Sequence, residues 1–398
     1  MSAGMGWHDL ALLKPFLAER HLDLAREAET FARERLAGRP EALTDEAARV
    51  EARELLGELG RAGLCRWAIP EAWGGVAGAP DALALCLIRE ALAAASPLAD
   101  SVFALQGLGS MPLTLSGNDA ARARWLGRVA AGEAMAAFAM TEPEAGSDVA
   151  SMTTLAHADG DGYVLEGGKH LITNAGVADY YVVFAQTAPG AGAKGIGAFL
   201  VEAGDPGLTF VRAQVLSSPH PLGELAFRGC RVGAEAVLGG PGEGFKLGLA
   251  TLDRLRPTVA AAACGMAARA LEEALAHARG RRQFGRPLAE HQLVQARLAE
   301  MATELAAARL LTYRAAWEIA SGAPRATYEA AMAKSYAAEA AQRVVDGAVQ
   351  ILGGRGVLVD HPVDRLYRSI RALRIYEGTT EIQHLVIARE LLKRSQGA

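Results

Sequence analysis

The pattern of apolar and polar positions changes twice along the chain. Apolar residues recur at helical spacing from residue 7 to about 133, and again from 244 onward. Between about 134 and 240, glycine, aspartate and proline instead separate short runs of β-branched and aromatic residues. The pattern predicts an α+β chain with an N-terminal helical domain (1–133), a middle antiparallel β domain (134–240) and a C-terminal four-helix-type bundle (241–398).

Individual helices follow from the same spacing. Gly63 is the expected C-cap of one N-terminal helix, and a helix over 83–95 should stop near Pro97. Pro257 should kink a long helix of the bundle. The apolar stripe from Leu293 to Leu311 suits a bundle or an oligomer interface. The C-terminal helices are expected over 245–279, 288–320, 325–352 and 361–375, with a last one from 381.

The middle domain should contain several short strands. Gly167-Gly168 predicts a hairpin turn within it. The strands are expected at Tyr163–Leu165, Tyr180–Phe184, Ile196–Val201, Leu208–Val211 and Leu225–Phe227.

Composition excludes several classes of protein. Lysine and arginine total 41 against 45 aspartates and glutamates, and no long basic run stands out, so nucleic acid is a poor candidate partner. Cys65, Cys86, Cys230 and Cys264 lie far apart and predict buried free thiols in a reducing compartment. The histidines show no metal-binding spacing, so we expect no metal site. Without a signal-peptide pattern or a membrane-spanning segment, the chain reads as cytoplasmic.

The most informative segment reads YEGTTEIQ and begins at Tyr376. It places Glu377 on a glycine-broken turn before a helix, with Thr380 as the expected N-cap and Gln383 as its capping-box partner. A carboxylate held out of water on such a turn has a raised pKa and can act as a general base. The alternative is a solvated turn glutamate.

Two segments of the middle domain carry candidate ligand groups. The sequence TEPEAGSD, from Thr141, follows an apolar strand and can offer backbone N–H groups and hydroxyls to a planar ring or an anion, or it can be a simple β-turn. The sequence KHLITNAG, from Lys169, would place the Thr173 hydroxyl at the end of a strand.

Two further segments interrupt the bundle. Arg281 and Phe284, in RRQFG between two helices, suit a pyrophosphate and an adenine, although a polar loop is the commoner case. The sequence QILGGRG, from Gln350, ends another helix, and its glycines can be a C-cap. A match to GxGxxG at 190–195 is followed by a β-like run, so it predicts a loop between strands.

Taken together, these segments resemble the acyl-CoA dehydrogenase family over essentially the whole chain. The N-terminal segment IPEAWGG, from Ile69, and the TEPEAGSD, ITN, RRQFG, QILGGRG and YEGTTEIQ segments follow the family's order and spacing. The resemblance implies FAD bound between the β domain and the bundle, and a homotetramer. It also implies an acyl-CoA substrate and electrons passed to electron transfer flavoprotein.

By that resemblance Glu377 is the catalytic base, which takes the α-proton while the β-hydride goes to flavin N5. Some family members carry the base just before the arginine that matches Arg256, but this chain has Leu255 there. The Glu377 N–H and a flavin hydroxyl would polarise the thioester carbonyl.

The resemblance also assigns binding residues. Met140, Thr141 and Thr173 would contact the flavin ring, and Ser147 would lie between cofactor and CoA. Asp253 and Arg256 would line the acyl-CoA channel, or form an ordinary salt bridge, and Tyr376 would lie beside the acyl chain. The residues that would reach the ADP half of a neighbouring subunit's FAD are Arg281, Phe284, Gln350, Gly353 and Gly354. Thr379 and Glu381 would lie near the phosphate or adenosine of FAD.

Two departures from the family pattern concern the cofactor and CoA sites. Leu171 stands where many relatives have tryptophan, and Pro219-His220-Pro221 replaces a more charged segment. The latter, with the run 365–377, also resembles dehydrogenases of alicyclic carboxyl-CoA thioesters. The alternatives are a same-fold oxidase, decarboxylating dehydrogenase or monooxygenase, or a non-enzymatic helical interaction protein.

Overall fold

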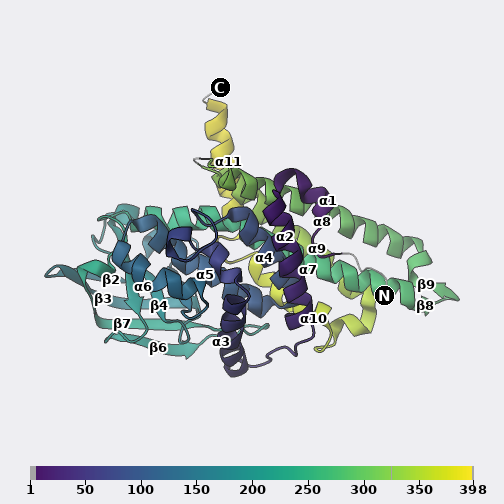
Figure 1. Cartoon of the computed structure of the whole chain (residues 1–398), viewed down its shortest axis with the longest axis horizontal. Coiled ribbons are helices and arrows are strands. Elements are labelled where there is room, and N and C mark those ends of the chain that lie inside the picture. The colour runs from purple at the N-terminus through teal and green to yellow at the C-terminus, as the bar shows by residue number, and fades with distance from the viewer. Residues whose placement is uncertain (1–5, 324, 397–398) are drawn as a thin grey trace. The chain divides into compact units, whose positions relative to one another are not determined.

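The computed structural model describes residues 6–323 and 325–396; the remaining positions, which include the ends of the predicted terminal domains, lie outside the described residues. The chain forms two compact units. The helical unit comprises Met1–Glu41, Ala82–Asp100 and Asp253–Ala398, and the sheet unit comprises Ala42–Asp81 and Ser101–Leu252 (Figure 1). Two of the four unit boundaries fall inside helices, one in α5 (Pro97–Ser116) and one in α7 (Gly244–Gly280).

The sheet unit contains the helices α3 (Asp45–Arg61) and α6 (Asp119–Ala130) besides most of α5. Gly63 has a φ of 73° just after α3, as its predicted C-cap role requires. The strands are β1 (Ala136–Ala139), β2 (Leu155–Asp159), β3 (Gly162–Thr173), β4 (Tyr180–Gln186), β5 (Ile196–Glu202), β6 (Leu208–Ala213) and β7 (Leu222–Val232). These confirm the five predicted strands.

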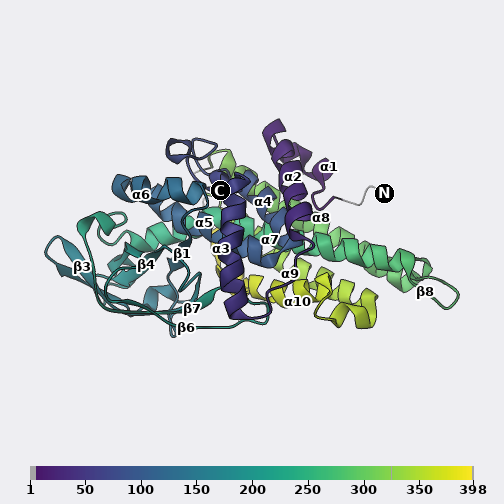
Figure 2. The same cartoon turned by 60° about the horizontal axis from the view of Figure 1, so that its bottom comes forward.

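The strands form one sheet in the order β1-β4-β2-β3-β7-β6, with β5 also paired to β4. Figure 2 labels β1, β4, β3, β7 and β6 of this sheet. The pairing is antiparallel except where β4 runs parallel to β1 and β2. Every residue of β4 is buried. One face packs on Leu113 of α5 and on Trp125 and Leu126 of α6, whereas the other faces a core that includes Phe199 and Phe227.

The prediction of a hairpin turn at Gly167-Gly168 is wrong. Both residues lie inside β3, and Gly167 sits at a register shift with a φ of 137°. A Cβ there would come within 2.8 Å of the Thr154 Cα, so only glycine fits this bulge. The turn between β2 and β3 uses Gly160 instead, with a φ of 64°.

The helical unit is built mainly from long helices of the C-terminal region. Helix α7 continues through Pro257. Helix α8 begins at 292 and not at the predicted 288, because residues 288–290 form a separate short turn. The helices are α1 (Leu10–Leu13), α2 (Glu19–Phe31), α4 (Ala82–Ala95), α8 (Gln292–Ala320), α9 (Thr327–Leu352), α10 (Pro362–Leu373) and α11 (Thr380–Gln396). A short hairpin of β8 (Arg282–Gln283) and β9 (Arg286–Pro287) lies between α7 and α8.

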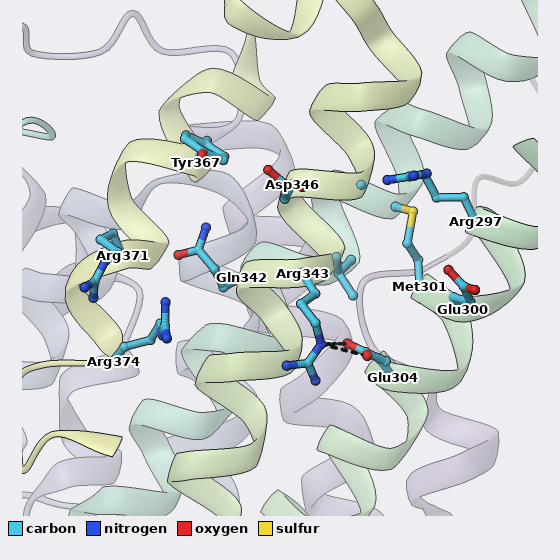
Figure 3. A pocket seen from close by; sticks show the side chains of 12 residues that line it. Arg297, Glu300, Met301, Glu304, Gln342, Arg343, Asp346, Tyr367, Arg371 and Arg374 are labelled. Carbon is cyan, nitrogen blue, oxygen red and sulfur yellow. Dashed lines mark hydrogen bonds and ion pairs between the residues drawn. The ribbon is translucent and has the colours of Figure 1, made fainter. Parts of the chain in front are cut away.

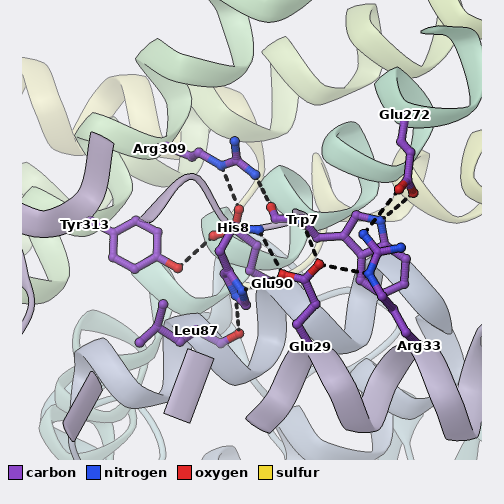
Figure 4. A network of polar contacts seen from close by, with 9 residues as sticks. All are labelled: Trp7, His8, Glu29, Arg33, Leu87, Glu90, Glu272, Arg309 and Tyr313. Atoms are coloured by element: carbon purple, nitrogen blue, oxygen red, sulfur yellow. Dashed lines mark hydrogen bonds and ion pairs between the residues drawn. The ribbon is translucent and has the colours of Figure 1, made fainter. Parts of the chain in front are cut away.

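A buried polar network fixes α4 within this unit (Figure 4). Glu90 of α4 accepts hydrogen bonds from Arg309 Nε and from the Tyr313 hydroxyl, both at 2.7 Å. Arg309 also donates to the Trp7 carbonyl, and the Trp7 indole donates to Glu272 of α7 at 2.8 Å. The network thus joins α4 directly to α8, and through Arg309 and Trp7 to the N-terminal segment and α7.

Candidate active site

The turn between α10 and α11 has a strained backbone. Glu377 has a φ of 54° and Gly378 a φ of 93°. A non-glycine residue in the left-handed region costs on the order of 1–3 kcal/mol, and such residues persist where surrounding structure imposes them. Among the described residues the other non-glycine residues with positive φ are Leu171, Asn174 and Phe284. All four lie in segments that the sequence singles out as candidate ligand sites.

Side chains from three helices hold the carbonyls of this turn. The Glu377 carbonyl accepts hydrogen bonds from Arg256 Nε of α7 and from Gln383 Nε2 of α11, both at 3.3 Å. The Gly378 carbonyl accepts from Lys334 Nζ of α9 at 2.7 Å and from Gln383 Nε2 at 3.1 Å. These contacts impose the strained conformation and so fix where the Glu377 side chain lies.

The Glu377 carboxyl group has the character of a base. Its Oε2 atom is buried and has no hydrogen-bond partner among the described residues. Burial raises the pKa of this carboxyl, and the positive charges of Arg89, Arg256 and Lys334 oppose that rise. The solvated-glutamate alternative does not fit a buried oxygen without a partner.

The cap of α11 differs from the prediction by one residue. The helix begins at Thr380, and Thr379 is its cap, because the Thr379 hydroxyl accepts from the Ile382 N–H at 3.3 Å. The Thr380 hydroxyl instead donates to Glu339 at 2.8 Å. Gln383 makes no capping box, since its amide is used on the turn carbonyls.

Asp253 and Arg256 form an ion pair within α7. Asp253 also accepts from the Thr327 hydroxyl at 2.6 Å, and Arg256 is almost fully buried. The salt-bridge alternative is therefore present, and Arg256 additionally contacts the strained turn. A role in lining an acyl-CoA channel stays a prediction for both residues.

In the sheet unit, the candidate flavin contacts lie around the end of β1. The Met140 carbonyl accepts from Lys169 Nζ at 3.2 Å, and the Thr141 carbonyl accepts from the His170 N–H at 2.9 Å. Thr173 is the last residue of β3, as predicted. The half-buried hydroxyls of Thr141 and Thr173 make no hydrogen bond with any described residue, which leaves them open to a ligand.

A buried ion pair holds this loop. Glu142 accepts from Lys169 Nζ at 2.7 Å, from the Thr153 N–H at 2.6 Å and hydroxyl at 2.9 Å, and from the Thr154 N–H at 3.0 Å. Lys169 is 1% exposed. The hydrogen bonds of Glu142 thus tie the segment after β1 to β3 and to the residues before β2. Ser147, which lies farther along the same loop, is exposed.

Leu171, which replaces the family's common tryptophan, is 48% exposed and has a φ of 54°. Its N–H donates to Gln214 Oε1 at 2.8 Å. Leu171 thus exposes an apolar side chain two residues before Thr173.

The candidate ADP contacts lie on exposed parts of the helical unit. Phe284, in the β8–β9 hairpin with Arg281 just before it, is 95% exposed and has a φ of 52°. Gln350 is exposed near the end of α9, and Gly353 caps that helix with a φ of 60°. Gly354, Thr379 and Glu381 also have part of their surface exposed. The Phe284 ring is therefore accessible to a ligand or a second protein chain.

Comparison with known proteins identifies the family of this chain. Models of three acyl-CoA dehydrogenase domains match the chain in order: the N-terminal domain over 18–133, the middle domain over 137–230 and the C-terminal domain over 242–392. The chain belongs to the acyl-CoA dehydrogenase family. It is accordingly an oxidoreductase, and the predicted family and fold class are confirmed.

Individual acyl-CoA dehydrogenase relatives align along nearly the full chain. This chain is 40% identical over 379 residues to a probable acyl-CoA dehydrogenase FadE25 of Mycobacterium tuberculosis, and the alignment covers 95% of this chain and 96% of that one. It is 37% identical to a 3-(aryl)acrylate reductase of Clostridium sporogenes, covering 95% and 100%. The solved butyryl-CoA dehydrogenase of Megasphaera elsdenii superposes with a TM-score of 0.88 at 35% identity, covering 94% and 99%.

One groove of the helical unit contains none of the predicted site residues of this acyl-CoA dehydrogenase. It has a volume of about 580 Å³ and lies between α8, α9 and α10 (Figure 3). Arg297, Glu300, Asp346 and Arg371 are among its charged lining residues. Within the described residues, no helix has the length and apolar character to cross a membrane.

Sequence reasoning missed several groups around Glu377. Lys334 lies on the alanine-rich helix α9, and Arg89 lies on α4, where every residue is buried. Asp100, the partner of Arg89, lies in the first turn of α5. The available signal was a charged side chain inside an otherwise apolar helix, which requires a buried partner.

Proposed function

We propose that this protein is an FAD-dependent acyl-CoA dehydrogenase that introduces an α,β double bond into an acyl-CoA thioester. The observation that carries the proposal is the buried, unpartnered Oε2 of Glu377 on a strained turn. Such a carboxylate can take a weakly acidic α-proton, because burial raises its pKa.

The chain supplies the groups for proton removal. Glu377 takes the α-proton onto its carboxyl group, while Arg256, Lys334 and Gln383 hold the turn rigid. The Glu377 N–H has no acceptor among the described residues, so it can donate to the thioester oxygen as negative charge develops there. Tyr376 would lie beside the acyl chain.

FAD, when bound, supplies the flavin N5 that accepts the β-hydride. The open hydroxyls of Thr141 and Thr173 fit hydrogen bonds to the flavin ring beside Met140, and Ser147 would lie toward CoA. On the helical unit, the exposed ring of Phe284 fits an adenine contact. With Phe284, the residues proposed for the ADP half are Arg281, Gln350, Gly353, Gly354, Thr379 and Glu381.

The proposal extends to partners and place. Arg281 and Phe284 would contact FAD of a neighbouring subunit, which requires a homo-oligomer, and we propose a tetramer. Electrons would leave to electron transfer flavoprotein, and the enzyme would work in the cytoplasm in fatty acid or carboxylic acid catabolism.

A second function is favoured by one relative. The Clostridium sporogenes protein is named a 3-(aryl)acrylate reductase, which indicates reduction of a double bond rather than its formation. The same carboxyl group would then deliver the α-proton. An oxidase, a decarboxylating dehydrogenase or a monooxygenase would differ in its electron acceptor or in the fate of the substrate.

The test is anaerobic titration of the purified protein with a panel of thioesters, read by flavin absorbance. The panel holds short, medium, branched, aryl-propionyl and cyclohexanecarboxyl thioesters. Bleaching by one class supports the dehydrogenase and names its substrate class. Bound flavin that no thioester bleaches, but that an acrylate reoxidises after chemical reduction, supports the reductase, and a colourless protein contradicts both.

A further inference from the structure

Arg89 and Asp100 form a buried, bidentate ion pair. Arg89 Nε donates to Asp100 Oδ1 at 2.7 Å and Nη2 donates to Oδ2 at 2.8 Å. Arg89 Nη1 donates to the Thr258 hydroxyl of α7 at 2.9 Å. Both charged side chains are 3% exposed. Every nitrogen of the guanidinium group therefore has a partner from α5 or α7.

Packing alone does not explain this pair. A buried ion pair contributes little net stability compared with well-packed apolar residues, because both charges lose their hydration. The neighbouring Glu90 already ties α4 to Arg309 and Tyr313. The Arg89–Asp100 pair calls for a second explanation.

The pair lies next to the turn that carries the base. Arg89 Nη1 contacts Thr258 of α7, the helix whose Arg256 Nε donates to the Glu377 carbonyl at 3.3 Å. Among the positive charges that oppose the rise in the pKa of Glu377, that of Arg89 has the largest effect. A guanidinium group at this place, if it had no carboxylate of its own, would be drawn to the unpartnered Oε2 of Glu377.

The cations that face Glu377 share one property: each is compensated. Arg89 is paired with Asp100, and Arg256 is paired with Asp253. Lys334 Nζ is bound to a carbonyl, and burial lowers the pKa of this lysine to about 8. Glu377 is thus surrounded by positive groups, and none of them forms an ion pair with it in the structure.

We propose that Asp100 is a positioning residue for the proposed α-proton abstraction: by engaging Arg89 at both oxygens, it prevents the guanidinium group from pairing with Glu377 and silencing the base. The inference rests on the proposed function. Asp100 acts through Arg89 and is not itself a catalytic residue.

The experiment compares Asp100→Asn, Arg89→Gln and the double variant with wild type. Two readouts are followed against pH: the rate of flavin bleaching by the active thioester, and the infrared band of the protonated Glu377 carboxyl. The band is identified by its loss in Glu377→Gln and needs no substrate. Glu90→Gln is the matched control, because it removes a buried charge from the same helix.

The signs of the shifts follow from the charges. Removing Asp100 exposes Glu377 to the full charge of Arg89, so its titration and the acid limb of the rate move to lower pH by roughly one unit or more. The limiting rate also falls several-fold, because a more acidic carboxyl is a weaker base. Removing Arg89 moves both to higher pH. The double variant returns both close to wild type, and the Glu90 control leaves them in place.

Contrary outcomes are separable. An unmoved Glu377 band in Asp100→Asn, or a double variant that deviates as far as the single one, overturns the inference. If no thioester bleaches the flavin of the wild type, while the Glu377 band shifts as described in Asp100→Asn and Arg89→Gln, only the proposed function is overturned. If Asp100→Asn does not fold, Arg89→Gln and the double variant still decide, because an unmoved band in Arg89→Gln refutes the electrostatic link.

Discussion

Replacing Lys169 by methionine should destabilise the sheet unit strongly. The change removes the hydrogen bonds from Lys169 Nζ to Glu142 and to the Met140 carbonyl. It leaves Glu142 as a buried carboxylate whose remaining partners are all neutral, from Thr153 and Thr154. Removing one partner of a buried pair costs about 3–5 kcal/mol. At about 2–4 °C per kcal/mol for a domain of this size, the melting temperature should fall by roughly 6–20 °C.

The pKa values indicate that the intact pair itself adds little. The pKa of Glu142 is lowered to about 2, because Lys169 and the hydrogen bonds outweigh burial. That contributes about 3 kcal/mol above pH 4.5, which is lost as the pH falls toward 2. At Lys169, burial lowers the pKa more than the charge of Glu142 raises it, so this pKa falls to about 8. The charged form of Lys169 is therefore less stable in the folded protein than in the unfolded one, and it opposes folding at neutral pH. The double variant Glu142→Gln with Lys169→Met should therefore melt well above Lys169→Met, although below wild type, because the glutamine amide nitrogen cannot accept the hydrogen bond that one carboxylate oxygen accepts from Thr153 or Thr154.

The assay is thermal unfolding of the flavin-loaded protein, followed by circular dichroism and by flavin release. Lys194→Met is the control, because Lys194 lies in a surface turn and makes no ion pair within the described residues. The reasoning is refuted if Lys169→Met melts within about 2 °C of wild type, or if the double variant is no more stable than the single one.

Three further changes test the turn and the exposed hairpin. Gly378→Ala should cut the bleaching rate at least tenfold, because the residue has a φ of 93° and a Cβ would come within 2.4 Å of Gln383 Nε2; an unchanged rate would contradict the rigid turn. Lys334→Met should move the acid limb of the rate to higher pH, because a positive charge that lowers the pKa of Glu377 is lost, and a limb at lower pH would reverse the assigned sign. Phe284→Ala should weaken FAD retention at least fivefold in equilibrium dialysis while the melting temperature of the apoprotein stays within about 1 °C, because the ring is 95% exposed; unchanged retention would remove this residue from the proposed site.

Local signals in the sequence were sufficient for the elements and for the turn. The strands β3 to β7 and the ends of α9 and α10 lie close to where spacing, glycine and proline predict them. Gly167-Gly168 misled because a glycine pair is also what a bulge needs when a neighbouring backbone approaches closely. The predicted cap of α11 was wrong by one residue, because both Thr379 and Thr380 have a side chain that can cap a helix. The hydroxyl of Thr380 instead donates to Glu339, which leaves Thr379 as the cap.

The surroundings of Glu377 could not be predicted from local patterns. Lys334 and Arg89 come from helices that are distant in sequence, and only the tertiary fold brings them to the turn. The segment around Glu377 predicted a buried base, but not how many cations would oppose its raised pKa.

The rate of anaerobic flavin bleaching in Glu377→Gln, with the thioester that reduces the wild type, tests the central claim most directly. Glutamine keeps the size of the side chain but cannot accept the proton, so the rate should fall by at least 10³-fold while flavin content and thioester affinity stay near wild type. A variant that bleaches within tenfold of wild type would show that another group takes the α-proton, and would contradict the assignment of Glu377 as the base.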